Sequence, residues 1–186
     1  MTVGDRYRTP DLDWIAIHFA PVRLALFVTC MRRFSAVVVL LLIAGCGKQK
    51  IPAPTLAALE GADQYELLSL NSFLSKGAPS EGFYRWRVLG RTSISDKATR
   101  KKLNDALRAG VRESVGAVAS CFNARHAIHV TRAGKVTDVV ICFECLHAKV
   151  ITDGESSGGF LTTESPQEVF DNVLKEAGIP LAAKPK

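Results

Sequence analysis

Three cysteines and one histidine stand close together in the stretch CFNARHAIHVTRAGKVTDVVICFEC, which covers residues 121–145. They are Cys121, His126, Cys142 and Cys145. Thiols and imidazoles at such spacings serve three kinds of chemistry: a structural disulfide, a zinc site, or thiol redox and nucleophilic catalysis. The three hypotheses require different covalent states of the same sulfur atoms.

A disulfide is the first hypothesis for these cysteines. In an oxidising compartment, three thiols give one disulfide and one free thiol. Cys142 and Cys145 cannot pair if the segment between them stays extended. Three residues at about 3.3 Å each would exceed the ~4.4 to 6.8 Å found between the Cα atoms of bridged cysteines. We therefore expect Cys121 to be bonded to Cys142 or to Cys145.

A zinc site is the alternative. The pattern C-x4-H followed by C-x2-C supplies ligands of the types and number that zinc takes, namely Cys121, His126, Cys142 and Cys145. They converge only if CFEC forms a knuckle.

The third hypothesis is a thiol enzyme in which His126 activates a neighbouring thiol. Redox C-x2-C pairs of the thioredoxin type sit at a helix N-terminus, whereas this pair follows a β-branched run.

A signal for export precedes this region. The segment MRRFSAVVVLLLIAGCGKQK begins with Met31 and two arginines and continues with an apolar run over residues 34–43. That run is about half of the ~20 residues that a transmembrane helix needs. Because LIAGC resembles the lipobox of bacterial lipoproteins, we expect cleavage after Gly45 and acyl chains, palmitate among them, on Cys46. Several chains are needed for stable anchoring.

The signal peptide divides the chain into regions. We expect residues 31–45 to be the signal peptide, and residues 1–30 to be an upstream extension produced by a misplaced start codon. The alternative is a real extension with a signal-anchor helix. Residues 46–63 are polar with two prolines and predict a flexible tether. Residues 64–183 then form a single α+β domain.

The charge of the exported part excludes one class of partner. Residues 46–186 carry 19 Lys and Arg against 15 Asp and Glu, a net charge of +4. Nucleic-acid-binding domains usually concentrate more positive charge, and an exported protein would not meet DNA. We therefore expect no nucleic acid, and a membrane-lipid contact through the anchor on Cys46.

A β-hairpin is predicted to hold the cysteines and the histidine. Residues 126–132 and 135–145 alternate in polarity around Ala133-Gly134, a two-residue loop. That loop places His126 opposite Ile141. A three-residue loop would instead place Asp138 opposite an apolar residue, which burial disfavours. The preferred register puts five apolar side chains on one buried face: Ile128, Val130, Val139, Ile141 and Phe143.

The remaining elements complete the predicted fold class. Residues 65–70, 83–94 and 159–163 predict strands, and residues 146–151 either extend the hairpin or form another strand. A helix over 97–115 has Asp96 as its N-cap, and its Leu103, Leu107 and Val111 share one side. A second helix lies between Pro166 and Gly178. We expect an α+β domain, a small antiparallel β-sheet with two helices packed on one face.

Several blocks carry a family resemblance. YELLSLN, WRVLGRTSI, CFNARHAI, VICFEC and SPQEVFDNVLKEAGIPLA resemble a family of small, uncharacterised bacterial exported proteins and lipoproteins. The most specific blocks are the paired motifs CFN-x-RH-x-I and ICFEC. The resemblance covers most of residues 65–183 and implies export, but it implies no activity.

The sequence therefore predicts a lipoprotein of the bacterial cell envelope, anchored to a membrane through Cys46. Its expected role is that of a non-enzymatic binding or structural module with a cysteine-stabilised hairpin and no cofactor. A zinc-binding protein is the alternative, and a thiol redox enzyme is the third hypothesis.

Overall fold

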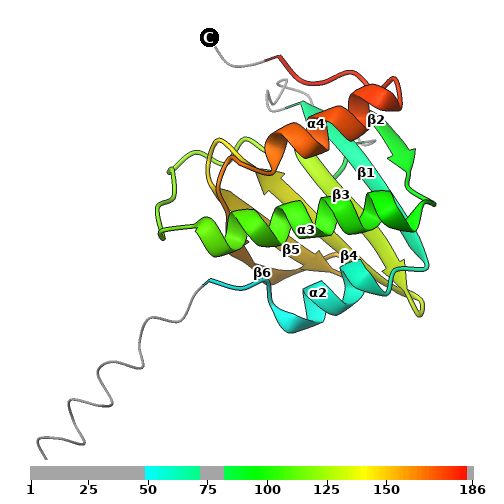
Figure 1. Cartoon of the computed structure of the whole chain (residues 1–186), viewed down its shortest axis with the longest axis horizontal. Coiled ribbons are helices and arrows are strands. Elements are labelled where there is room, and N and C mark those ends of the chain that lie inside the picture. Colours follow the sequence, from blue (N-terminus) through cyan, green and yellow to red (C-terminus); the bar gives the residue numbers. More distant parts are fainter. Residues whose placement is uncertain (1–48, 72–81, 184–186) are drawn as a thin grey trace, which may run out of the picture. The chain divides into compact units, whose positions relative to one another are not determined.

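The computed structural model describes residues 49–71 and 82–183, and the element labels follow Figure 1. The predicted upstream extension, signal peptide and lipidated Cys46 lie outside the described residues. None of the described helices is long and apolar enough to cross a lipid bilayer. The elements in chain order are α2 (Ala53–Glu60), β1 (Gln64–Asn71), β2 (Arg87–Ser93), α3 (Lys97–Glu113), β3 (His126–Arg132), β4 (Lys135–Cys142), β5 (His147–Thr152), β6 (Glu155–Leu161) and α4 (Gln167–Glu176).

The strands form one six-stranded antiparallel sheet in the order β2-β1-β3-β4-β5-β6. The three described helices, α2, α3 and α4, lie on the same face of this sheet (Figure 1). The predicted α+β class, with an antiparallel sheet and helices on one face, is confirmed. The structure adds a third helix to the two that the sequence predicted.

The hairpin of β3 and β4 has the predicted register. His126 pairs with Ile141, Ile128 with Val139, and Val130 with Thr137. The two loop residues, Ala133 and Gly134, have φ angles of 49° and 78°. A type I′ turn requires positive φ at both central positions, and its twist matches that of the flanking strands. The prediction that burial selects the two-residue loop is therefore confirmed.

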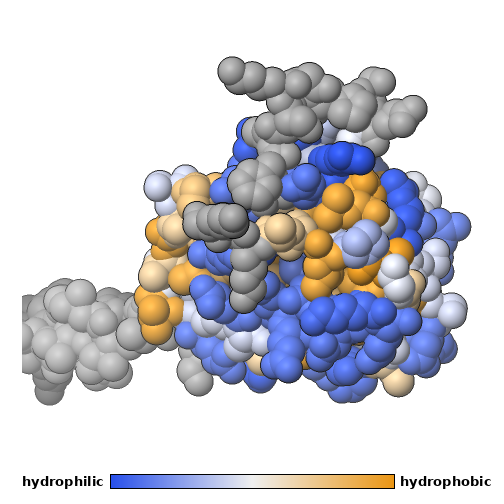
Figure 2. Space-filling model, turned by 90° about the horizontal axis from the view of Figure 1, so that it is seen from above, coloured by the Kyte–Doolittle hydropathy of each residue, from blue (hydrophilic) through white to orange (hydrophobic). Residues whose placement is uncertain are grey.

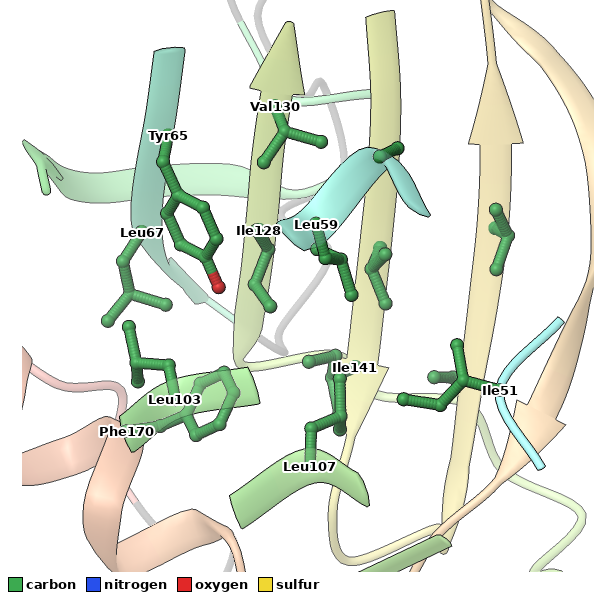
Figure 3. Close-up of a cluster of buried hydrophobic side chains, with 14 of the residues drawn as sticks. Ile51, Leu59, Tyr65, Leu67, Leu103, Leu107, Ile128, Val130, Ile141 and Phe170 are labelled. Atoms are coloured by element: carbon green, nitrogen blue, oxygen red, sulfur yellow. The ribbon is translucent and has the colours of Figure 1, made fainter. Parts of the chain in front are cut away.

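The main core lies between the sheet and the helices, where Figure 3 shows its largest side chains. Leu67, Ile128 and Ile141 point from the strands toward Leu103 of α3 and Phe170 of α4, and all five are fully buried. The Tyr65 hydroxyl lies in the same layer and donates to Asn104 Oδ1 at 3.1 Å, so the core contains one satisfied polar pair.

Helix α3 supplies much of that core and begins where its cap predicts. The Asp96 carboxylate accepts a hydrogen bond from the Thr99 N–H at 2.8 Å and satisfies one of the free amides of the first turn. Leu103, Leu107 and Val111 lie four apart and are buried against the sheet. The predicted helix, its N-cap and its apolar side are confirmed.

A second, smaller cluster covers part of the opposite sheet face. Leu68, Ala127 and Val140 point to that face and pack with the buried Trp86 and the partly buried Phe122. The residues that cover them come from outside the strands, on the segments before β2 and before β3. Figure 2 shows from above that hydrophobic residues reach the surface only in separate areas between hydrophilic ones.

The prediction of a flexible tether over residues 46–63 is wrong for the second half of that segment. Residues 53–60 form α2, and Ile51 and Leu59 are buried in the main core at 7% and 1% exposure. The sequence did not predict this helix because the apolar and small residues of APTLAALE lie on several of its sides instead of one. The domain therefore begins before residue 64.

Two strand predictions need correction. The strand expected over 83–94 begins only at Arg87, because residues 83–86 form a tight turn in which Phe83 and Trp86 pair and Tyr84 has a φ of 57°. Residues 147–152 form β5, a separate strand, and β6 begins at Glu155, earlier than the predicted segment 159–163.

A pair of substitutions tests the two faces of the hairpin. Val139→Asp should lower the free energy of unfolding by about 3 kcal/mol or more, because it places an unpaired charge at a fully buried site. Thr131→Asp, half-buried on the other face near the turn, should change it by less than about 1 kcal/mol. Urea denaturation of both variants measures the difference, and equal losses would contradict the assignment of faces.

Candidate functional site

The segment that follows β4 is a tight turn closed by a disulfide. Cys142 ends β4, residues 143–146 turn, and β5 begins at His147. The Cα atoms of Cys142 and Cys145 are 5.1 Å apart and their sulfur atoms are bonded. The expectation that Cys121 would pair is wrong, because CFEC turns instead of staying extended and so brings its own two cysteines within bridging distance.

Hydrogen bonds within the turn and from outside it fix its conformation. Leu146, with a φ of 57°, donates its N–H to the Phe143 carbonyl at 3.1 Å, and Thr162 donates to the Leu146 carbonyl at 3.0 Å. The Ala119 N–H reaches the Cys145 carbonyl at 3.2 Å. These bonds join the disulfide turn to the loop before β3 and to the residue that follows β6.

Cys121 lies on that loop and is the free cysteine of the described chain. Its neighbours on either side, Ala119 and Asn123, both donate hydrogen bonds to Cys145, the latter to Sγ at 3.4 Å. The thiol of Cys121 is exposed, whereas Cys142 and Cys145 are both 1% exposed. The loop therefore holds Cys121 near the disulfide in the fold but leaves its thiol at the surface.

The four residues proposed as zinc ligands do not form a site. Cys142 and Cys145 are bonded to each other, so neither offers the thiolate that zinc binds. His126 contacts a carboxylate instead of a thiol. Among residues 49–71 and 82–183, no group of three or more His, Cys, Asp or Glu side chains is placed to hold a metal ion.

The buried imidazole of His126 forms a hydrogen bond with the partly buried carboxylate of Asp171. Its Nε2 lies 2.8 Å from Asp171 Oδ1 of α4, and its ring packs on Phe143 and Phe170 with centroid distances of 5.3 and 6.0 Å. The imidazole is 2% exposed. Burial alone would raise the pKa of Asp171, but the hydrogen bond and charge of His126, with the charge of Lys175, outweigh it and lower that pKa. The carboxylate is therefore ionised and Nε2–H donates to it.

Arg125, next to His126, carries the least satisfied polar group of this region. Its side chain is 8% exposed and its Nη2 lies 3.2 Å from Glu144 Oε1 of the disulfide turn. Nε and Nη2 nevertheless lack a partner in hydrogen-bonding geometry, as does Nδ1 of His126. No other buried side-chain nitrogen or oxygen of the described chain is left without one. Buried polar groups without a hydrogen-bond partner are rare in native proteins, so these nitrogens single out this region.

A pocket of about 270 Å³ opens beside these groups. Arg125, His126, Asp171, Lys175 and Gln167 line it together with Leu181 and Ala182 of the C-terminal segment. The polar lining offers donors and one carboxylate, and the two apolar residues form a wall. Such a lining suits a small polar ligand that carries an acceptor group next to a donor.

A second polar cluster lies on the opposite face of the sheet. Asp138 is 4% exposed and accepts hydrogen bonds from Tyr84 Oη at 2.5 Å and, through its other oxygen, from His129 Nδ1 at 2.6 Å. Burial, the hydrogen bond between Tyr84 and Asp138, and the negative charge of Asp138 all raise the pKa of Tyr84. The cluster attaches the turn before β2 to the centre of the sheet.

Sequence reasoning missed both carboxylates, for different reasons. Asp138 pairs with His129 across the hairpin, so the correctly predicted register already contained this contact. Asp171 lies forty-five positions after His126 on α4, and no sequence spacing links the two. Only the packing of α4 over the start of β3 brings them together.

Comparison with known proteins gives no assignment. No protein-family model matches the chain, and neither a curated protein nor a solved structure resembles it significantly.

The state of the cysteines is directly testable. In protein purified without reductant, an alkylating reagent should modify Cys121 before denaturation, because its thiol is exposed. Cys142 and Cys145 should stay unmodified after denaturation, and non-reducing peptide mapping should recover them as one cross-link. A cross-link that contains Cys121, or alkylation of all three residues, would contradict this pairing.

The pH dependence of stability tests the hydrogen bond between His126 and Asp171. Because the folded pKa of Asp171 lies below its ordinary value of 3.8, its contribution is complete above that pH and is lost as the pH falls through the folded pKa. Asp171→Asn should therefore cost about 1 to 3 kcal/mol near pH 7 and progressively less in acid.

Chemical denaturation between neutral pH and about pH 3 measures this difference, and Glu176→Gln, exposed on the same helix, is the matched control. A deficit in Asp171→Asn that stays constant over the whole pH range would show that the carboxylate charge is not what stabilises the pair.

Proposed function

We propose that this protein is an exported, lipid-anchored module of the bacterial cell envelope that binds or supports a partner without catalysing a reaction. The anchor is the acylated Cys46, and the module is the α+β domain that follows it. This proposal joins the signal in LIAGC to the chemistry of the folded part.

The disulfide between Cys142 and Cys145 is the observation that carries the proposal. Disulfides form and persist in oxidising environments such as the bacterial periplasm and the cell surface, and are rare in the cytosol. Both sulfur atoms are buried, which suits a structural bond better than a catalytic one, because exchange needs access for the attacking thiolate. A buried structural disulfide and an export signal support the same compartment.

The placement of the remaining reactive side chains favours binding over catalysis. His126 is held between two aromatic rings and bonded to Asp171, so it supports the packing of α4. Cys121 is exposed, while the ring of His126 is buried, so the two are not arranged as a nucleophile with its base. The polar pocket beside Arg125 gives such a module a place for a small ligand.

The anchor is tested by the mass and location of the native protein. Intact-mass analysis should show a chain that begins at Cys46 and carries acyl chains. Cys46→Ser should leave the chain uncleaved or release it, while the melting temperature of the domain stays unchanged, since Cys46 precedes the first core residue, Ile51. A native chain without acyl chains would contradict the anchor, and peptides from residues 1–30 would contradict the misplaced start.

A further inference from the structure

The net positive charge of the exported chain is concentrated on one helix. Helix α3 contains six basic residues, Lys97, Arg100, Lys101, Lys102, Arg108 and Arg112, against two acidic ones. The rest of residues 46–186 therefore has thirteen basic and thirteen acidic residues and is neutral overall. Of the described elements, α3 therefore carries the largest excess of positive charge and attracts an anionic partner most strongly.

A groove lies beside α3. It has a volume of about 550 Å³ and separates α3 from the end of α2, the segment from Leu59 to Ala62. Lys97, Arg100, Lys101 and Arg108 line it against the acidic Glu60 and Asp105. Figure 1 shows α2 and α3 on the same, helix-covered face of the sheet.

The two arginines of the groove are held by its walls. Arg100 donates from Nη1 to the Ala62 carbonyl at 2.8 Å and from Nε to the Ile94 carbonyl, while Arg108 pairs with Glu60 and Asp105. Lys97, Lys101 and Lys102 are exposed, and Lys101 pairs with the exposed Asp105. Lys97 lines the groove and Lys102 lies outside its lining on the same helix, so these two ammonium groups are available to an anion.

The chain length after the anchor limits how far this groove can be from a membrane. Ala53, the first residue of helix α2, follows Cys46 by seven positions, which span at most ~25 Å when fully extended. The eight residues of α2 add ~12 Å. A lipid on Cys46 would therefore keep the groove at the end of α2 within ~37 Å of the bilayer.

We infer that the α2–α3 groove and the exposed lysines of α3 bind the phosphate groups of anionic lipids in the membrane that holds the anchor. The choice of this occupant rests on the proposed acylation of Cys46. Phosphate oxygens complement clustered ammonium groups, and basic residues next to an anchor add electrostatic attraction to an anionic surface. The helix-covered face is then turned to the bilayer, and the opposite sheet face is turned away from it.

A footprint on the lipidated protein tests the contact. The native protein is reconstituted in vesicles of phosphatidylcholine, with and without phosphatidylglycerol, and treated with an amine-reactive reagent. Lys97, Lys101 and Lys102 should be modified several-fold more slowly on the anionic vesicles, and high salt should remove this protection. Lys135, at the exposed hairpin turn, should react equally on both vesicles. Equal rates for the α3 lysines on both vesicles would overturn the inference.

Charge reversal measures the same contact without the lipid anchor. The full chain carrying Cys46→Ser is sedimented with both vesicles, and the phosphatidylglycerol-dependent part of its affinity is compared between variants. Lys97→Glu with Lys101→Glu should weaken that part at least about tenfold. The matched control, Lys135→Glu with Lys149→Glu, has the same net charge and should change it about twofold or less. Equal losses in the two variants would overturn the inference, because bulk charge would then explain the binding.

The two experiments separate this inference from the proposed function. If Cys46 carries acyl chains but the α3 lysines are not protected from modification, the anchor is supported and the groove is not a lipid site. If the native protein carries no lipid but the Cys46→Ser chain binds anionic vesicles in a salt-sensitive way, the anchor is contradicted and the groove is supported. Unchanged melting temperatures of both double variants exclude unfolding as the cause of any loss.

Discussion

The pairing of β3 with β4 across Ala133 and Gly134 is the constraint on which the other described features depend. Side chains alternate between the two faces of a strand, so a shift of one residue would exchange the contents of the faces. In the observed register, Ile128 and Val139 face the helices, while His129 and Asp138 face the other way and bond to each other. One register therefore gives a dry core on one face and a satisfied polar pair on the other.

The two faces then serve different purposes. The helix-covered face buries the large core, and its outer layer presents the basic residues of α3 and the groove beside α2. The opposite face is covered by short irregular segments. Tyr84 of one segment donates a hydrogen bond to Asp138 of the sheet. The ring of Phe122 lies 5.7 Å from the ring of Trp86.

The end of the sheet where β3 begins and β4 ends collects the groups with chemical character. Arg125, His126 and the disulfide turn meet there because the turn returns the chain after Cys142, and α4 closes over them with Asp171. The disulfide closes the turn that carries Glu144, whose Oε1 lies 3.2 Å from Arg125 Nη2. The disulfide, the contact of His126 with Asp171 and the polar pocket beside Arg125 therefore share one end of the sheet.

The sequence by itself determined the features that depend on local spacing. Alternating apolar residues and the Ala133-Gly134 loop predicted the hairpin and its register, and Asp96 with Leu103 and Leu107 predicted α3, because periodicity and capping act within a few residues. The tertiary structure alone decided the cysteine pairing, since the turn at residues 143–146 is fixed by bonds from Ala119 and Thr162, far away in the chain. It likewise decided the contact of His126 with Asp171 and the burial of α2, because contacts between distant segments leave no period in the sequence.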